Sequence, residues 1–413
     1  MSPRNRDKPS EPAPRPQRRR GVVRIRAEAT TRILSGHPWV FRDALRTRGD
    51  LPAEEGEIVT LQDPDGRFVA AGFFEREGAV AIRVLSVDPD QPPGPDLYRR
   101  RAHQAVDLRQ ALIPDSTTAY RVINGEGDGL PGVTVDRYGD YLVAQLFSLA
   151  AEPLAEAVYP VLMERYGARG LYEQLRLRPT AGERRPAASL KLGKVAPVEV
   201  CVTEHGRQFL VDVSAPMGVG LFPDLREARH WVGRHAKGRR VLNTFSYTGA
   251  FTVHTAAGGA DSVTAVDQSA KVHAWSRKNL RQNGLDPETA CEHLTGDVTG
   301  ALTKLARDNA RFDLAIVDPP SFSRSRKGSF SSARDYAELV SQTLTLLAPA
   351  ALLLAVSNTA RLSEDEFARA LGRGANQAGR ELRLVRRFPL PPDFPVPPAF
   401  SEGSYLKAYL CTV

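Results

Sequence analysis

The chain has 413 residues, too many for one ordinary domain, and this length predicts two or three domains. Hydrophobic residues make up 42% and charged residues 25%, as in globular proteins, and no stretch approaches the roughly 20 uninterrupted apolar residues of a membrane helix. The cysteines Cys201, Cys291 and Cys411 lie far apart with no C-x-x-C, so their spacing suggests neither a disulfide framework nor a zinc site. Because the first twenty residues lack the apolar segment of a secretory signal, we expect a cytoplasmic protein without a membrane or metal partner.

The net charge of +8 is distributed unevenly. Residues 1–20 hold seven Lys or Arg and two acidic residues, which gives +5 and leaves +3 for the rest of the chain. This segment also has five prolines and nothing to bury, so it is predicted to be a disordered basic tail. Two roles stay open for it: holding RNA phosphates by charge, or keeping the protein in solution.

The first folded part is predicted to be a small β-barrel over residues 21–95. Four short apolar runs, VVRIR, EIVTLQD, RFVAAGFF and VAIRVLSV, are separated by Asp-Gly and other glycine-containing turns. The segment PDQPPGP at 89–95 is typical of a linker.

An α+β middle domain is predicted over residues 96–215. A stretch rich in Arg and Ala, from Leu97 to about Leu112, reads as a helix. Strand patterns follow it, with the glycine-rich loop NGEGDGLPG at 124–132 leading into a predicted hairpin, VTVDRYGDYLVAQ.

From residue 216 to residue 413 strands alternate with helices, which predicts an α/β domain on a mostly parallel, doubly wound sheet. Ligands bind such sheets at the carboxyl ends of the strands. The first strand runs into a turn with Gly249, and the next ends in Asp267, about twenty residues on, where an acid can accept both ribose hydroxyls of a nucleoside. A third element places Asp297 beside a purine edge.

The turn at Gly249 decides between cofactors. A dinucleotide fold has G-x-G-x-x-G and a P-loop has G-x-x-x-x-G-K-[ST], and neither pattern occurs here. Without a phosphate cradle, a nucleoside cofactor lacking phosphate fits better, and we expect S-adenosyl-L-methionine. The alternative is that these acidic residues only end their strands.

The fourth strand of this domain, Phe312–Val317, ends on an acid, two prolines and an aromatic residue: Asp318, Pro319, Pro320 and Phe322. Proline gives no N–H to a sheet and fixes its own φ, so the strand stops and the following atoms are held stiffly. A carboxylate, backbone carbonyls and a stacking ring at a strand end can clamp a base pulled out of an RNA stack. We therefore predict that these four residues form part of a catalytic site.

Seven motifs together carry a resemblance to a known family. The chain resembles the bacterial large-subunit (23S) ribosomal RNA methyltransferases, which combine an N-terminal PUA domain, a middle domain and a Rossmann-like class I methyltransferase domain. The likeness runs from about Gly21 to Val413. The motifs are GHPWVF (36–41), NGEGDGLPGVTVDRYGDYLV (124–143), GLFPDLR (220–226), VLNTFSYTGAF (241–251), VDQS (266–269), DPPSF (318–322) and EGSYLKAYLC (402–411).

The resemblance implies an RNA-binding barrel, an S-adenosyl-L-methionine site and 23S ribosomal RNA, free or in early assembly, as the partner. A second copy of the chain is a further expected partner. Leu225 stands where relatives often have Gln. The cofactor contacts that the resemblance implies are Phe222, Arg226, Phe245, Tyr247, Gly249, Asp267 and Asp297.

The chain departs from the family's cytosine-C5 members at two positions. Those relatives use a cysteine thiolate, because cytosine C5 is a poor nucleophile until a thiolate adds at C6. The matching position here is Asn358, and Phe394 stands where relatives commonly have His in D-H-P. The pair Ser-Asn is more similar to methyltransferases that act on guanine N7. The hypothesis is therefore direct transfer to a ring nitrogen, with Asn358 bonding a base edge or holding Asp318.

Three alternatives remain open at this point. The protein could methylate cytosine C5 with another nucleophile, or it could be a non-catalytic RNA-binding relative. It could also methylate a protein or a small molecule, although such a substrate needs no RNA-docking barrel.

Overall fold

The computed structural model describes the chain in eight stretches. Residues 1–20, for which the sequence predicts a disordered tail, lie outside them, and so does Phe322. Within the described residues no helix combines the length and the apolar character needed to cross a membrane. The described stretches are 21–46, 53–177, 188–216, 218–320, 323–325, 328–330, 333–359 and 362–413.

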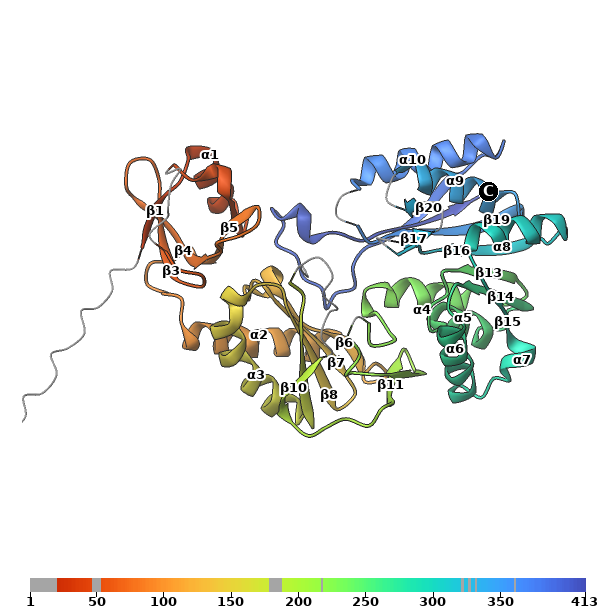
Figure 1. Ribbon diagram of the computed structural model, residues 1–413, viewed down its shortest axis with the longest axis horizontal. Helices are drawn as coiled ribbons and strands as arrows, with labels where there is room; N and C mark the ends of the chain where they lie inside the picture. Colours follow the sequence, from red (N-terminus) through yellow and green to blue (C-terminus); the bar gives the residue numbers. More distant parts are fainter. Residues whose placement is uncertain are drawn as a thin grey trace, which may run out of the picture.

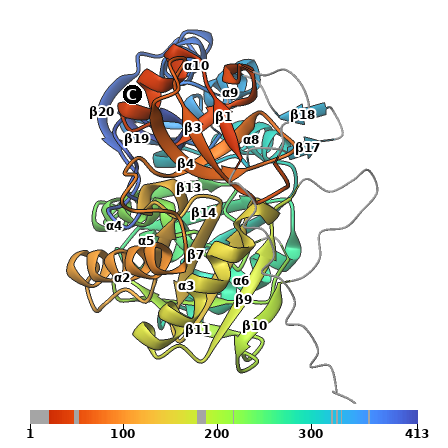
Figure 2. The ribbon, with the colours of Figure 1, turned by 90° about the vertical axis from the view of Figure 1, so that its left-hand side faces the viewer.

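The N-terminal part is a small, strongly curved sheet with one helix (Figures 1 and 2). Its strands are β1 (Val22–Arg24), β2 (Trp39–Phe41), β3 (Ile58–Gln62), β4 (Phe68–Phe74) and β5 (Val80–Ser86), in the order β1-β3-β4-β5-β2. Buried and less buried residues alternate along β3, as expected for a strand with one face on a core. The buried face packs with α1 (Ala27–Leu34), so the predicted small β-domain is present.

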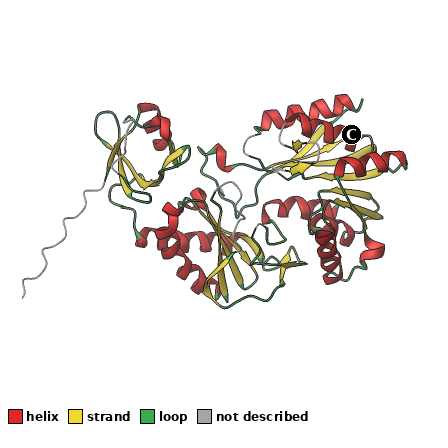
Figure 3. Cartoon of the chain, in the orientation of Figure 1, coloured by secondary structure: helices red, strands yellow, loops and turns green. Residues whose placement is uncertain are grey.

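The middle part is a five-stranded sheet with two helices on one face (Figure 3). Its elements are α2 (Pro95–Leu112), β6 (Ala119–Asn124), β7 (Val133–Tyr138), β8 (Tyr141–Leu146), α3 (Glu152–Tyr166), β9 (Gly170–Leu175) and β10 (Ser189–Gly193). The strand order is β10-β9-β8-β7-β6, and β7 and β8 form the predicted hairpin. A separate hairpin, β11 (Val200–Glu204) with β12 (Arg207–Val211), leads into the next domain.

The C-terminal part is a seven-stranded sheet in the order β15-β14-β13-β16-β19-β21-β20. The first five strands in this order are parallel, and β21 is antiparallel to both neighbours, which confirms the predicted doubly wound sheet. The strands are β13 (Arg240–Thr244), β14 (Ser262–Asp267), β15 (Glu292–Thr295), β16 (Phe312–Val317), β19 (Leu347–Ser357), β20 (Arg383–Phe388) and β21 (Lys407–Thr412); β17 (Ser323–Ser325) and β18 (Gly328–Phe330) form a separate hairpin.

Helices cover both faces of this sheet (Figure 1). One face packs against α4 (Arg226–Arg234), α5 (Ala250–Ala257) and α6 (Ala270–Gln282), and the other against α8 (Val298–Arg307), α9 (Ala333–Leu344) and α10 (Glu364–Gln377). A short helix, α7 (Pro287–Ala290), precedes β15. The chain leaves β13 toward β14 and later returns to β16 on the other side of β13. A ligand crevice is expected at that reversal.

The loop between β20 and β21 reaches out of the C-terminal domain to both other parts (Figure 1). Asp393 in this loop is fully buried and accepts the backbone N–H of Arg121 from β6 at 2.8 Å. A Cβ on Gly127 of the middle domain would lie 1.8 Å from the Pro395 carbonyl oxygen, so only glycine permits this approach. Farther along, the Phe400 ring meets Trp39 of the barrel at 4.6 Å between centroids. The loop therefore holds the three parts together.

Candidate active site

The turn after β13 is unusually tight. Phe245 and Tyr247 have φ of 56° and 48°, which non-glycine residues rarely adopt, and Gly249 follows with φ of 82°. A Cβ at position 249 would lie 2.1 Å from the Ser276 hydroxyl oxygen, so this position must be glycine. The turn ends where α5 begins, at Ala250. It therefore brings backbone N–H groups to the carboxyl edge of the sheet.

The carboxylate of Asp267 holds this turn. One oxygen accepts the Tyr247 N–H at 3.0 Å, and the other accepts the Ser269 N–H at 3.1 Å. Since Thr244 pairs with Val266 in the parallel ladder, the turn and the carboxylate lie at the same level of the sheet. An ionised carboxylate has about four acceptor positions, so two remain for a ligand's hydroxyl groups.

Two aromatic rings stand beside the turn. Phe222 and Tyr247 are stacked, with ring centroids 5.7 Å apart and planes 29° apart, and Phe222 remains 48% exposed. The Tyr247 hydroxyl donates to the Gly218 carbonyl at 3.2 Å, and burial raises the pKa of Tyr247 to about 12. The pair therefore offers an exposed aromatic face next to the Asp267 carboxylate.

Asp297 and Arg226, the two other polar residues of the predicted cofactor site, lie in different environments. Asp297 is exposed at the start of α8, where its carboxylate accepts the Gly300 N–H at 3.2 Å. It follows β15 at the same sheet edge as Asp267. Arg226 is 1% exposed, and its guanidinium donates to both Asp393 oxygens at 2.7 and 3.1 Å. The Asp393 carboxylate already binds this guanidinium. The contact of Arg226 with a cofactor stays a prediction.

The ends of β16 and β19 lie side by side. The two strands pair in parallel up to Val317 and Ala355, so Asp318 and Asn358 follow at one edge. The buried Tyr336 hydroxyl donates to a β19 carbonyl at 2.8 Å and fixes the position of this edge. Asn358 is exposed. The sequence thus placed both predicted catalytic side chains at adjacent strand ends.

The carboxyl group of Asp318 has an altered acidity. Burial and then the negative charge of Asp224 raise its pKa to about 7, against the opposing effect of Arg229. Pro319 is buried after it, whereas Pro320 is exposed. A carboxyl group that titrates near neutral pH in a crevice is a candidate for a catalytic role.

A buried lysine connects this edge to the last strand. Lys407 at the start of β21 is 4% exposed and donates to the carbonyls of Thr359 at 2.7 Å and Tyr405 at 3.0 Å. Burial lowers its pKa. Lys407 thus holds the segment that carries Asn358 against the segment that carries Tyr405.

Comparisons with known proteins agree with this geometry. Residues 168–411 match the family described as S-adenosylmethionine-dependent methyltransferase, and residues 23–87 match the PUA-like domain. The Ribosomal RNA large subunit methyltransferase I of Erwinia tasmaniensis is 34% identical over 92% of this chain and 96% of that protein; its counterpart in Serratia proteamaculans is 33% identical over the same shares. The chain belongs to this methyltransferase family. It is an S-adenosylmethionine-dependent enzyme, as the sequence predicts.

Solved structures show the same fold over nearly the whole chain. A methyltransferase solved in complex with SAH is 24% identical, has a TM-score of 0.86 and aligns over 95% of this chain and 100% of its own. An S-adenosylmethionine-dependent methyltransferase from Streptococcus mutans is 24% identical over the same shares, with a TM-score of 0.84. The combination of a class I methyltransferase domain with a PUA-like and a middle domain is therefore confirmed.

The residues at the β13–β15 edge of the methyltransferase domain fit S-adenosylmethionine. Asp267 keeps acceptor positions for two ribose hydroxyls, and Phe222 and Tyr247 offer a ring face beside it. The single-glycine turn provides no cradle for a pyrophosphate. When bound, the cofactor supplies a methyl group on a positively charged sulfur.

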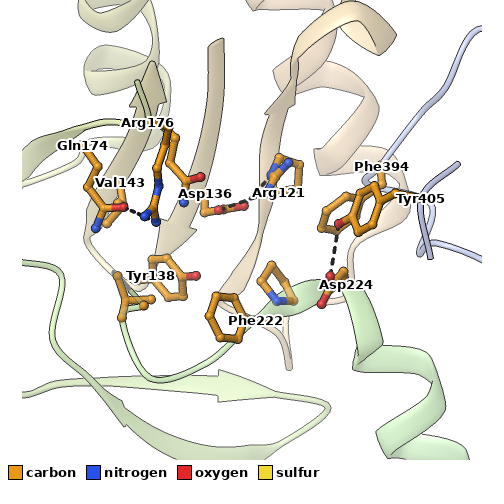
Figure 4. Close-up of a pocket in the computed structure, with 14 residues that line it drawn as sticks. Arg121, Asp136, Tyr138, Val143, Gln174, Arg176, Phe222, Asp224, Phe394 and Tyr405 are labelled. Atoms are coloured by element: carbon orange, nitrogen blue, oxygen red, sulfur yellow. Dashed lines mark hydrogen bonds and ion pairs between the residues drawn. The ribbon is translucent and has the colours of Figure 1, made fainter. Parts of the chain in front are cut away.

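Sequence reasoning missed a pocket of about 140 Å³ between the middle and methyltransferase domains (Figure 4). Strands β6–β9 supply one wall, which includes Arg121, Asp136 and Gln145; the segment before α4 and the β20–β21 loop supply the other, which includes Phe222, Asp224, Phe394 and Tyr405. These residues are far apart in the sequence. Two of them had been singled out, Phe222 as a cofactor contact and Phe394 as a departure from the family pattern, but neither as part of a shared pocket.

In the described part of the chain no cysteine lies at the edge formed by the ends of β16 and β19. Cys201 is exposed on the β11–β12 hairpin. Cys411 pairs with Leu353 in the middle of the β19–β21 ladder, and Cys291 is buried just before β15. Burial raises the pKa of both buried thiols to about 12, so neither forms a thiolate near neutral pH.

Proposed function

We propose that the protein transfers the methyl group of S-adenosylmethionine directly to a ring nitrogen of a base in 23S ribosomal RNA, with guanine N7 as the preferred atom. The observation that carries this proposal is Asn358 at the edge formed by β16 and β19, beside Asp318. An amide forms no covalent adduct with a pyrimidine. A ring nitrogen needs none, because it already has a lone pair to attack with.

The reaction requires alignment more than activation. The lone pair of N7 attacks the methyl carbon while the bond between that carbon and sulfur breaks, so the positive charge passes from sulfur to the purine ring. No proton has to leave. Holding the two reacting atoms about 3–3.5 Å apart, in line, supplies most of the acceleration.

Each predicted catalytic residue has a role in this scheme. The ionised Asp318 carboxylate stabilises the positive charge that the purine ring acquires. The Asn358 amide donates a hydrogen bond to the base carbonyl next to the attacking nitrogen. Pro319 and Pro320 keep the strand end rigid. Asp267 holds the ribose of the cofactor.

The N-terminal barrel is the proposed docking module for RNA. A groove of about 230 Å³ between α1 and β2 is lined by Arg26, Arg32, Trp39 and Phe41, among others. The Arg32 guanidinium lies 5.2 Å from the centre of the Phe41 ring. Guanidinium groups interleaved with aromatic rings bind phosphates and unstacked bases. The related proteins named as ribosomal RNA methyltransferases support an RNA substrate.

Nucleoside mass spectrometry tests the proposal. Ribosomal RNA from a strain lacking the gene is incubated with the pure protein and methyl-labelled S-adenosylmethionine, then digested. Labelled 7-methylguanosine is the expected product. Labelled 5-methylcytidine would contradict the role of Asn358, and absence of label with cofactor binding intact would favour a non-catalytic relative. Asp267→Ala serves as the inactive control.

The proposal has two further parts: the substrate is 23S RNA that is free or in early assembly, and the enzyme binds a second copy of its own chain. We expect faster labelling of protein-free 23S RNA than of mature large subunits, because the target base must leave its stack. Sedimentation of the pure protein tests the expected second copy of the chain. RNA binding across salt tests the docking mode, since log affinity should fall by ~0.7 per phosphate contact on single strands for each unit of log salt.

A further inference from the structure

The interdomain pocket has the size of one aromatic ring. Its volume is about 140 Å³. A cavity of about 150 Å³ in another protein holds benzene. Phe222, at its mouth, is 48% exposed, so the ring is open to a partner. Figure 4 shows side chains from both domains converging on this space.

The pocket adjoins both halves of the active site. Phe222 stacks on Tyr247, whose N–H binds the Asp267 carboxylate. On the other side, the Tyr405 carbonyl accepts from Lys407, which also holds the segment carrying Asn358. A base in this pocket would therefore lie between the cofactor turn and the β16–β19 edge.

The aromatic wall is held rigidly. Phe394 is 3% exposed, and the Arg121 guanidinium lies 4.6 Å from the centre of its ring. Asp136 fixes that guanidinium with bonds of 2.6 and 3.3 Å. Contact of a base with such a ring does not depend on the identity of the base.

The polar groups of the pocket do discriminate among bases. One oxygen of Asp224 accepts the Tyr405 hydroxyl at 3.1 Å, which fixes the carboxylate and leaves further acceptor positions. Within the described residues, the Gln145 amide has no hydrogen-bond partner. Guanine presents N–H donors at N1 and N2 and an acceptor at O6 along one edge. A carboxylate accepts both donors, whereas it would repel the N3 and O2 acceptors of cytosine.

We propose that the six-membered ring of guanine binds in this pocket, with Asp224 accepting the N1 and N2 hydrogens, the Gln145 amide donating to O6, and Phe222 and Phe394 contacting the ring. The inference rests on the proposed function. It assigns base selection to residues outside the cofactor turn and the β16–β19 edge. Because N7 lies on the purine edge away from N1 and N2, that atom stays accessible to the methyl donor.

Binding of nucleotides to the full-length protein saturated with SAH tests this assignment. GMP, IMP and CMP are titrated and binding is followed by calorimetry. IMP lacks only the N2 amino group of GMP, so it makes one hydrogen bond fewer to the charged Asp224. The loss of such a bond raises Kd about 10-fold or more. We expect GMP to bind at least ~10-fold more tightly than IMP, and CMP more weakly still.

Three variants locate the effect. Asp224→Asn should reduce the preference for GMP over IMP to less than ~3-fold, and Asp308→Asn, an exposed acid at the end of α8, should keep the full preference. Phe394→Leu should weaken GMP and IMP equally. Unchanged SAH affinity shows that each variant is folded.

Equal binding of GMP and IMP, tighter binding of CMP, or a preference that survives Asp224→Asn would overturn the assignment. So would a failure of GMP to bind at millimolar concentration. If the preference holds while mass spectrometry finds the methyl group on an atom other than guanine N7, only the proposed function fails.

Discussion

Acidic side chains are held in two different ways on the two sides of the active site. On the cofactor side, Asp267 and Asp297 accept backbone N–H groups and stay open to a ligand. On the side of the middle domain, Asp136 and Asp393 are buried against arginines, which occupy their oxygens. The first arrangement leaves acceptors for chemistry, and the second fixes two domains in one geometry.

This difference has an energetic consequence. A carboxylate held by backbone N–H groups at a surface loses little when its ligand is absent, because water replaces the ligand. A buried ion pair depends on both partners, since removing one leaves an unpaired charge out of water. The buried ion pairs of Asp136 and Asp393 with arginines form what we call the domain seam. We therefore expect substitutions on the cofactor side to affect ligand binding and substitutions at the domain seam to affect folding.

The largest effect is expected from Asp393→Ala. Arg226 would keep its charge in a site that is 1% exposed, and the Arg121 N–H would lose its acceptor, at a cost of about 3–5 kcal/mol. The measurement is the urea midpoint of unfolding. Arg277→Ala, which breaks the exposed Arg277–Glu288 pair, is the control and should cost less than ~1 kcal/mol. Equal midpoints for both variants would show that the seam is not the stabilising element.

Asp267→Ala should weaken SAH binding by at least about 100-fold, because two hydrogen bonds to a charged group are lost and each contributes about 1.5–3 kcal/mol. RNA affinity should be nearly unchanged, since the proposed RNA-docking groove lies in the N-terminal barrel. Calorimetry with SAH and filter binding with RNA check the two expectations, with Asp308→Ala as the matched exposed control. Equal loss of both affinities would mean that Asp267 supports the fold and not the cofactor.

The transfer rate should depend on the protonation of Asp318. Its pKa is raised to about 7, so the carboxyl group is mostly protonated at pH 6 and mostly ionised at pH 8. If the ionised form stabilises the transition state, the single-turnover rate rises about tenfold over this interval and then levels off. Asp318→Asn should be slow and should not show this rise. An unchanged pH profile in that variant would assign the titration to another group.

The same shift predicts the sign of a stability effect. The folded protein keeps the Asp318 proton to a higher pH than the unfolded chain does, so stability falls as the pH rises from the ordinary Asp pKa toward about 7. Above that pH the asparagine variant should be as stable as the natural protein or more stable. Thermal unfolding at pH 5 and pH 8 measures the difference.

The smallest effect, no covalent product at all, is expected from Asn358→Cys with RNA that contains 5-fluorocytosine. A thiol at this position can trap only a cytosine held in the site. If the pocket selects guanine, a denaturing gel shows no cross-linked protein. A cross-linked band would mean that cytosine enters the site and that the pocket's base preference is not the one argued above.

The two sides also differ in how far the sequence predicts them. The turn at Gly249 and the strand ends at Asp267 and Asp318 are local patterns, because strand, turn and side chain follow within a few residues. The order of strands then places them together, as the alternating pattern predicts. The small β-barrel and the doubly wound sheet were predicted on the same basis, whereas the PUA assignment of the barrel came from the family resemblance.

The seam could not be predicted in this way. The family resemblance implies that Arg226, the last residue of the GLFPDLR motif, is a cofactor contact, yet its carboxylate partner is 167 residues further along the chain. Nothing local in the sequence marks Asp136, Asp224 and Phe394 as neighbours of one pocket. Such contacts follow from the docking of whole domains, which depends on the summed shape and charge of two surfaces.

The long reach of the β20–β21 loop has a consequence for synthesis of the protein. Arg121 and Asp393 are separated by 272 residues, so the ribosome makes the partner of β6 long after β6 itself. At about 5–20 residues per second the middle domain therefore waits many seconds with Arg109 and Arg121 lacking their contacts to Asp393. The barrel and middle domain can fold as units during this time. The contacts between these domains form only after the β20–β21 loop has been synthesised, in a late step of domain docking.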